Sequence, residues 1–233
     1  FFSEMWERFC FYGMRGMLAV FMVSQLQRDE ETTNLQYGAT QAFVYAFPFI
    51  GGLFADKILG LRKSLFWGGL LMIIGSLILS LDPKNFFFLG ISFTIVGTGF
   101  FKPNISSMVG QLYKENDVRQ DAGFSLFYAG VNIGALIGGY ICIAVAEGSL
   151  WSGYVPEHLR WNFAFGFAAI VMVVSLLTFT QTQKSLGEIG LSPLKHLEKS
   201  KRRIREIITY IGSLAIIPVI ILIIGGGGAA AYF

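Results

Sequence analysis

The chain opens with FFSEMWERFCFYGMR, residues 1 to 15, and an apolar run follows directly. Glu4, Glu7, Arg8 and Arg15 place four charges in a segment that is otherwise apolar enough to lie in lipid. Each charge near the centre of a spanning helix costs about 2.5 to 3.5 kcal/mol on insertion scales. On a helix, Glu4, Arg8, Tyr12 and Arg15 share one face, with Glu7 beside it. We therefore expect a polar stripe that faces a cavity and serves a function.

The composition indicates a membrane protein. Of the 233 residues, 54% are hydrophobic and 14% are charged, and the mean hydropathy is +0.58. An average soluble domain is about a quarter charged. Cys10 and Cys142 both lie in apolar stretches, so the sequence predicts neither a disulfide framework nor a cysteine metal site. We expect His158 and His196 to be ordinary loop residues.

Seven apolar stretches are long enough to cross a bilayer core, which takes about 20 residues. They lie near 3–26, 35–55, 63–81, 86–112, 121–146, 161–182 and 205–224. Short polar loops join the first six, so consecutive helices should be antiparallel neighbours. We predict an all-α membrane protein with a six-helix bundle over 1–182 and a basic cytoplasmic linker over 183–204. Residues 205–233 would form one further apolar helix, either inserted between two halves or beginning the second.

The basic residues predict the orientation. If the N-terminus is cytoplasmic, the inner loops and the linker hold twelve Lys and Arg residues and the outer loops hold three. This asymmetry fits the positive-inside rule for a protein of the cytoplasmic (inner) membrane. We read the basic run 195–205 as a topogenic linker rather than a nucleic-acid or lipid-binding patch. The first residue is not Met, so we expect further residues before it.

A loop motif stands between the second and third stretches, Gly52-x-x-x-Asp56-x-x-x-Gly60-x-Arg62-Lys63. It resembles the loop signature of the major facilitator superfamily. Asp56 is expected to cap a helix end and to pair with basic residues across a turn that Gly60 permits. The implied role is a structural latch on the cytoplasmic side.

Three further motifs resemble those of the proton-coupled oligopeptide transporters, a family within that superfamily. Glu4-x-x-Glu7-Arg8-Phe9-x-Phe11-Tyr12-Gly13 is similar to E-x-x-E-R-F-x-Y-Y-G, with Phe11 in place of Tyr. Gly97-x-Gly99-x-x-Lys102-Pro103-Asn104 is similar to G-x-G-x-x-K-P-N. Phe127-Tyr128-x-x-Val131-Asn132-x-Gly134 is similar to F-Y-x-x-I-N-x-G. The resemblance covers residues 1 to about 182, which would be the N-terminal half of such a transporter.

The fourth stretch places a cation at membrane depth. Lys102 lies near its middle, and Pro103 cannot donate a backbone hydrogen bond to the carbonyl of Gly99, so we expect a kinked or loosened helix there. Lys102 would then serve a ligand or ion site, or it would be neutralised by Glu4 or Glu7, and both readings can hold at once.

The fifth stretch combines small and polar residues. Gly130, Gly134 and Gly138 recur at steps of four, which favours close packing against another helix. Tyr128 and Asn132 are expected to face a polar cavity, because an unpaired amide or phenol in lipid is costly. Tyr45 matches a tyrosine that lines the peptide site in this family, although by its sequence context it fits a packing position equally well.

The resemblance implies symport of di- and tripeptides with protons by alternating access, and neither an enzymatic activity nor a nucleic-acid partner. Protons would be the coupling ion, with no other cofactor and no metal. The implied proton-coupling residues are Glu4, Glu7, Arg8 and Lys102. The implied substrate-binding residues are Tyr12, Arg15, Tyr45, Lys102, Tyr128 and Asn132. The chain would work in the lipid bilayer with a missing C-terminal six-helix half. The alternative is a carrier of the same fold for another small anion, such as nitrate or a drug-like compound.

Overall fold

The structure is a computed structural model that describes residues 1–114, 117–151 and 153–226. Within these ranges the ordered elements are helices. The α-helices are α1 (Phe2–Ser24), α2 (Glu30–Phe54), α3 (Leu61–Leu81), α4 (Phe87–Gly110), α5 (Gln120–Glu147), α6 (Arg160–Thr182), α7 (Lys199–Ala215) and α8 (Ile217–Gly226). A π-helical turn, η1 (Ala55–Leu59), and three short 3-10 turns, η2 (Glu157–Leu159), η3 (Gln183–Leu186) and η4 (Pro193–His196), lie between them.

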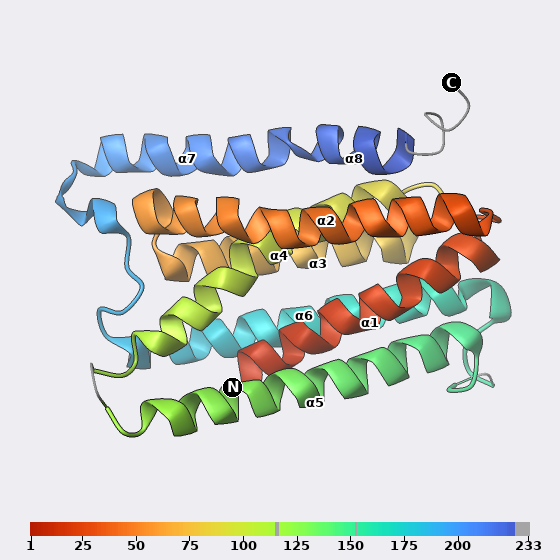
Figure 1. The fold of residues 1–233 in the computed structure, drawn as a ribbon, viewed down its shortest axis with the longest axis horizontal. Helices are drawn as coiled ribbons and strands as arrows, with labels where there is room; N and C mark the ends of the chain where they lie inside the picture. The colour runs from red at the N-terminus through yellow and green to blue at the C-terminus, as the bar shows by residue number, and fades with distance from the viewer. Residues whose placement is uncertain (115–116, 152, 227–233) are drawn as a thin grey trace.

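The first six α-helices form one bundle made of two groups. Helix α1 packs against α5 and α6, helix α4 packs against α2 and α3, and the contact between α3 and α6 joins the groups (Figure 1). At one end of the bundle the ring of Phe21 stacks on Phe87 at 5.0 Å and meets the edge of Phe165 at 5.7 Å. These rings tie α1, α4 and α6 together. The predicted all-α membrane fold is confirmed.

All seven predicted apolar stretches are helical. By length and composition, five helical segments of the described chain can cross a membrane: α2 with η1, α3, α5, α6 with its flanking turns, and α7 with α8. Helices α1 and α4, which carry Glu4, Glu7, Arg8, Arg15 and Lys102, fall outside this group.

The last helical segment differs from the sequence expectation at its start. Helix α7 begins at Lys199, not at residue 205, so the end of the predicted linker is helical. Charged residues with long side chains are good helix formers, and Arg202 lies one turn before its partner Glu206, at 3.7 Å. The segment is interrupted between Ala215 and Ile217, just before Pro218, which has no N–H for the preceding turn. Residues 227–233 lie outside the described part.

The small-residue stripe of α5 is where α1 crosses it. A Cβ added at Gly138 would lie 2.6 Å from the Cα of Phe9, and one at Gly134 would lie 3.1 Å from the Cβ of Arg8. Both are closer than ordinary van der Waals contact, so only glycine permits this approach. The predicted packing role of the stripe is confirmed, and it sets the position of the charged part of α1.

Candidate functional site

A charge cluster lies inside the bundle at the start of α1. Arg8 Nε is 2.8 Å from Glu4 Oε1, to which it donates a hydrogen bond, and 2.7 Å from Glu7 Oε2. The exposed fractions of Glu4, Glu7 and Arg8 are 3%, 0% and 3%. The expectation that all the charges of the opening stretch face one open cavity is therefore wrong for these three. The contacts of α1 with α5 and α6 cover them.

The cluster holds two carboxylates and one guanidinium. When both carboxylates are ionised, one negative charge is left over. Among the described residues, Glu4 Oε2, both carboxylate oxygens of Glu7 and Arg8 Nη2 are buried and have no hydrogen-bond partner. An uncompensated buried charge is strongly unfavourable. A second cation or a proton would therefore stabilise this cluster.

The ring of Phe11 lies near both Lys102 and Arg8 of the cluster. Lys102 Nζ lies 6.0 Å from the ring centroid of Phe11 and 5.1 Å from that of Tyr45. Arg8 Cζ lies 5.4 Å from the same Phe11 ring. Phe11 therefore contacts both cations, and such contacts use the ring face rather than a hydroxyl. Replacing the family's Tyr by Phe keeps this interaction.

A direct pairing of Lys102 with a carboxylate is not formed. In the part of the chain that the structure describes, Glu4 and Glu7 pair with Arg8, and no carboxylate lies within 4 Å of Lys102. Lys102 is half-buried on α4. The lysine is therefore placed to reach either the buried cluster or the surface that Tyr45 exposes.

Helix α4 continues through its proline. It is helical from Phe87 to Gly110, so the expected loosening at Pro103 does not interrupt it. The neighbouring glycines serve packing: a Cβ at Gly99 would lie 2.7 Å from the Cβ of Phe47 on α2, and one at Gly97 would lie 2.6 Å from the carbonyl oxygen of Gly68 on α3. The tight packing on both sides holds α4, and with it Lys102, close to α2 and α3.

Arg15 has a partner that was not predicted from the sequence. Its Nε donates a hydrogen bond to the hydroxyl of Tyr37 at 3.1 Å. Tyr37 precedes Tyr45 by about two helical turns on α2, and Arg15 follows Arg8 by two turns on α1. These similar spacings on α1 and α2 were the sequence signal that could have indicated the pairing of Arg15 with Tyr37. Arg15 and Tyr37 are both half-buried, farther along the helices than the buried cluster.

The remaining predicted binding residues lie outside the buried cluster. Tyr45 and Tyr128 are 63% and 59% exposed, and Asn132 is also exposed. Tyr12 is half-buried, with its ring 5.2 Å from that of Phe11. The structure thus brings Tyr12 close to Phe11 and Tyr45 close to Lys102. No hydrogen bond joins Tyr128 or Asn132 to these groups in the described chain.

The basic residues of the loop motif, Arg62 and Lys63, bind the segment after α6 rather than Asp56. Arg62 Nε donates to the carbonyl of Ile189 at 2.7 Å, Arg62 Nη2 donates to that of Gly187 at 2.6 Å, and Lys63 Nζ lies 2.6 Å from Glu206 Oε1. Asp56 is exposed in the π-helical turn, and its carboxylate forms neither a hydrogen bond nor an ion pair with any described residue. The expected pairing of Asp56 is therefore not observed, because both basic side chains reach towards residues 187–206.

Two glycines frame this turn. Gly60 has a φ of +77°, which glycine adopts without strain, and a Cβ there would lie 2.6 Å from the backbone of Leu191. Gly52 lies on α2 at the other end of the motif. The turn and the segment after α6 therefore fit against each other through the backbone.

The family model described as the POT family matches residues 62–210. The peptide transporter YePEPT of Yersinia enterocolitica is 39% identical over 189 residues, 77% of this chain and 35% of that protein. Dipeptide and tripeptide permease B of Aeromonas hydrophila is 31% identical over 219 residues, 93% of this chain and 41% of that protein. The solved structure of a bacterial homologue of the human drug peptide transporters PepT1 and PepT2 has a TM-score of 0.84 at 26% identity and covers 99% of this chain and 51% of its own.

The chain thus spans between about a third and a half of the length of these proteins. The family model matches well over half of the chain, from the start of α3 into α7, and the solved structure matches its fold. The chain therefore belongs to the POT family, the family whose motifs its first, fourth and fifth helices resemble.

Proposed function

We propose that the full-length protein carries di- and tripeptides together with protons across the cytoplasmic membrane, by alternating access between two halves. This chain would supply the N-terminal half of the site, with a C-terminal six-helix half as its partner. The names of its relatives support peptides as the substrate. The excess of basic residues on one side of the helices supports a cytoplasmic N-terminus.

One observation carries the proton-coupling part of the proposal: the buried cluster of Glu4, Glu7 and Arg8, with Lys102 held nearby on the ring of Phe11. The cluster carries one net negative charge when both carboxylates are ionised. Either the ammonium of Lys102 or a proton on one carboxylate would neutralise it. Proton binding and the approach of Lys102 are therefore alternatives at the same place.

This competition provides a coupling step. When a proton binds to Glu4 or Glu7, it neutralises the remaining negative charge of the cluster in place of Lys102. The ammonium of Lys102 is then available to bind substrate on the exposed side of α4. The same proton weakens the hold of the carboxylates on the cations in one access state more than in the other. Coupling is then a difference in proton affinity between the two states.

The peptide would occupy the side on which Tyr45 is exposed. Lys102 as a point charge and Arg15 as a planar fork would hold the terminal carboxylate. Tyr37 would orient Arg15 through the hydrogen bond at 3.1 Å. The hydroxyls of Tyr12, Tyr45 and Tyr128 and the amide of Asn132 would bind the peptide backbone, which all small peptides share. An acidic residue of the C-terminal half would bind the amino end.

The test uses the full-length protein in vesicles, with two assays in parallel: proton-driven accumulation of a labelled dipeptide, and counterflow exchange without a gradient. Glu7→Gln should abolish accumulation and leave exchange measurable, because the amide fills the same space without binding a proton. Glu157→Gln is the matched control, since that side chain is 88% exposed and outside the cluster. Accumulation that survives Glu7→Gln would refute the proton role.

The substrate is tested separately by competition at two pH values. Unlabelled di- and tripeptides should displace the labelled dipeptide, whereas nitrate and free amino acids should not. Lys102→Ala should impair both accumulation and exchange, because the lysine serves both the carboxylate and the cluster. Displacement by nitrate in preference to peptides would contradict the proposed substrate class.

A further inference from the structure

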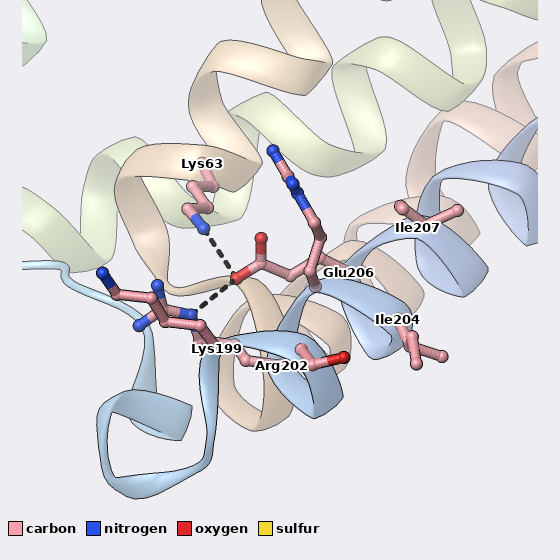
Figure 2. Close-up of a pocket in the computed structure, with 8 residues that line it drawn as sticks. Lys63, Lys199, Arg202, Ile204, Glu206 and Ile207 are labelled. Carbon is pink, nitrogen blue, oxygen red and sulfur yellow. Dashed lines mark hydrogen bonds and ion pairs between the residues drawn. The ribbon is translucent and has the colours of Figure 1, made fainter.

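A basic pocket lies between the beginnings of α3 and α7, away from the charge cluster of α1. It encloses about 600 Å³. Its charged lining residues are Lys63 on α3 and Lys199, Arg202, Arg203 and Glu206 on α7. Figure 2 shows that Lys63 and Arg202 both reach the same carboxylate oxygen of Glu206. The pocket is thus lined by four cations and one carboxylate.

The single carboxylate does not balance these cations. Glu206 accepts from Lys63 at 2.6 Å and lies 3.7 Å from Arg202. Lys199 and Arg203 are exposed and form no ion pair with any residue that the structure describes. The pocket therefore has an excess of positive charge, with two cations available to a ligand.

An apolar surface continues from the pocket along α7. Ile204 and Ile207 line the pocket and are 55% and 46% exposed. Ile208 and Ile211, one turn further, are 63% and 61% exposed. The opposite face of α7 turns inward, where Ser213 accepts a hydrogen bond from the indole of Trp67 at 3.0 Å. The exposed isoleucines therefore form an apolar face of α7 that no described residue covers.

The cations lie at one end of this surface and the isoleucines continue along the helix, as the charged headgroup and the apolar acyl chains do in a phospholipid. Helices α3 and α7 both begin beside the pocket, which places the cations at the level where apolar helix gives way to water. A phosphate headgroup would lie among the cations while its acyl chains follow the isoleucines. In contrast to the reading of the basic run 195–205 as a topogenic linker rather than a lipid-binding patch, we propose that this pocket binds an anionic phospholipid, with its headgroup on Lys199 and Arg203. In the proposed orientation the lipid belongs to the cytoplasmic leaflet.

The proposal is tested by native mass spectrometry of the full-length protein in detergent, titrated with phosphatidylglycerol or with phosphatidylcholine of the same acyl chains. Phosphatidylglycerol should bind more tightly. The double variant Lys199→Gln/Arg203→Gln should bind it about twenty-five-fold more weakly, since each cation near an anionic lipid surface is worth roughly fivefold in affinity. The matched control Lys201→Gln/Arg205→Gln removes the same charge from exposed positions of α7 outside the pocket and should leave the affinity unchanged.

Two results would overturn the proposal, and neither depends on transport. Equal losses in the two double variants would show attraction by net charge without a site. Displacement of phosphatidylglycerol by inorganic phosphate at equal concentration would show a free-phosphate site with no role for the isoleucines. The comparison of the two lipids on the unmodified protein stays decisive even if a variant fails to fold.

Discussion

Replacing Gly134 by alanine should separate α1 from α5. The added Cβ would lie 3.0 Å from the carbonyl carbon of Met5 and 3.1 Å from the Cβ of Arg8, and it would also overlap the carbonyl oxygen of Met5. Ordinary contact begins at 3.4 Å, so these two distances alone require the helices to part by about 0.3 to 0.4 Å, and the overlap with the carbonyl oxygen requires more. Overpacking of this kind costs about 1 to 3 kcal/mol. The shift also moves Arg8, so proton-driven accumulation should fall together with stability.

The control for this substitution lies on the same helix. A Cβ at Gly139 meets nothing within 4 Å, so Gly139→Ala adds helix propensity, worth up to about 1 kcal/mol, without a clash. The two variants of the full-length protein should be compared by their thermal unfolding midpoints in detergent at one scan rate, and by dipeptide accumulation in vesicles. If Gly134→Ala unfolds at the same temperature as Gly139→Ala, or higher, the argument from helix contact is refuted.

Substitutions at three other positions test separate contacts. Tyr37→Phe removes the 3.1 Å hydrogen bond to Arg15 and should weaken dipeptide affinity about fivefold, the equivalent of roughly 1 kcal/mol. Competition binding measures this affinity, and an unchanged value would contradict the prediction. Phe11→Leu removes the ring that both cations contact, and each cation–ring contact is worth about 0.5 to 2 kcal/mol. This variant should therefore reduce proton-driven uptake of dipeptide, whereas Phe11→Tyr should retain it. Equal losses of uptake in the two variants would argue against a role for the ring. Gly60→Ala forces a φ of +77° on a residue with a Cβ 2.6 Å from the backbone of Leu191, so its unfolding midpoint should fall, and an unchanged midpoint would disprove the strain.

The fold was predictable because its signals are local. Apolar length identified the helices, and the glycine spacing of α5 identified a close crossing, since both depend on residues within one helix. The start of α7 was missed because its first turns are charged and resemble a linker in composition. The ion pairs of Glu206 with Lys63 and Arg202 favour this helical start, and the first of them joins positions far apart in the sequence.

The candidate site was predictable in its members but not in its arrangement. The motifs selected Glu4, Glu7, Arg8 and Lys102, and the i,i+4 spacing of Glu4 and Arg8 on one helix is itself a local signal for their ion pair. What the sequence could not show is the contact between helices, which places the ring of Phe11 next to Lys102. Such a contact between α1 and α4 leaves no periodic trace in the sequence.

The hydrogen bonds of Arg62 have a consequence for how the gene can be divided. Loops between domains ordinarily tolerate cutting and insertion, because little of their backbone is bonded. Here the carbonyls of Gly187, Ile189 and Gly190 accept hydrogen bonds from Arg62, and Ser192 Oγ donates to the carbonyl of Ile58 at 2.6 Å. A fluorescent reporter or a protease site inserted within residues 187–192 would break these hydrogen bonds. A two-fragment version of the protein is better divided elsewhere, so that residues 187–192 stay bonded to the bundle.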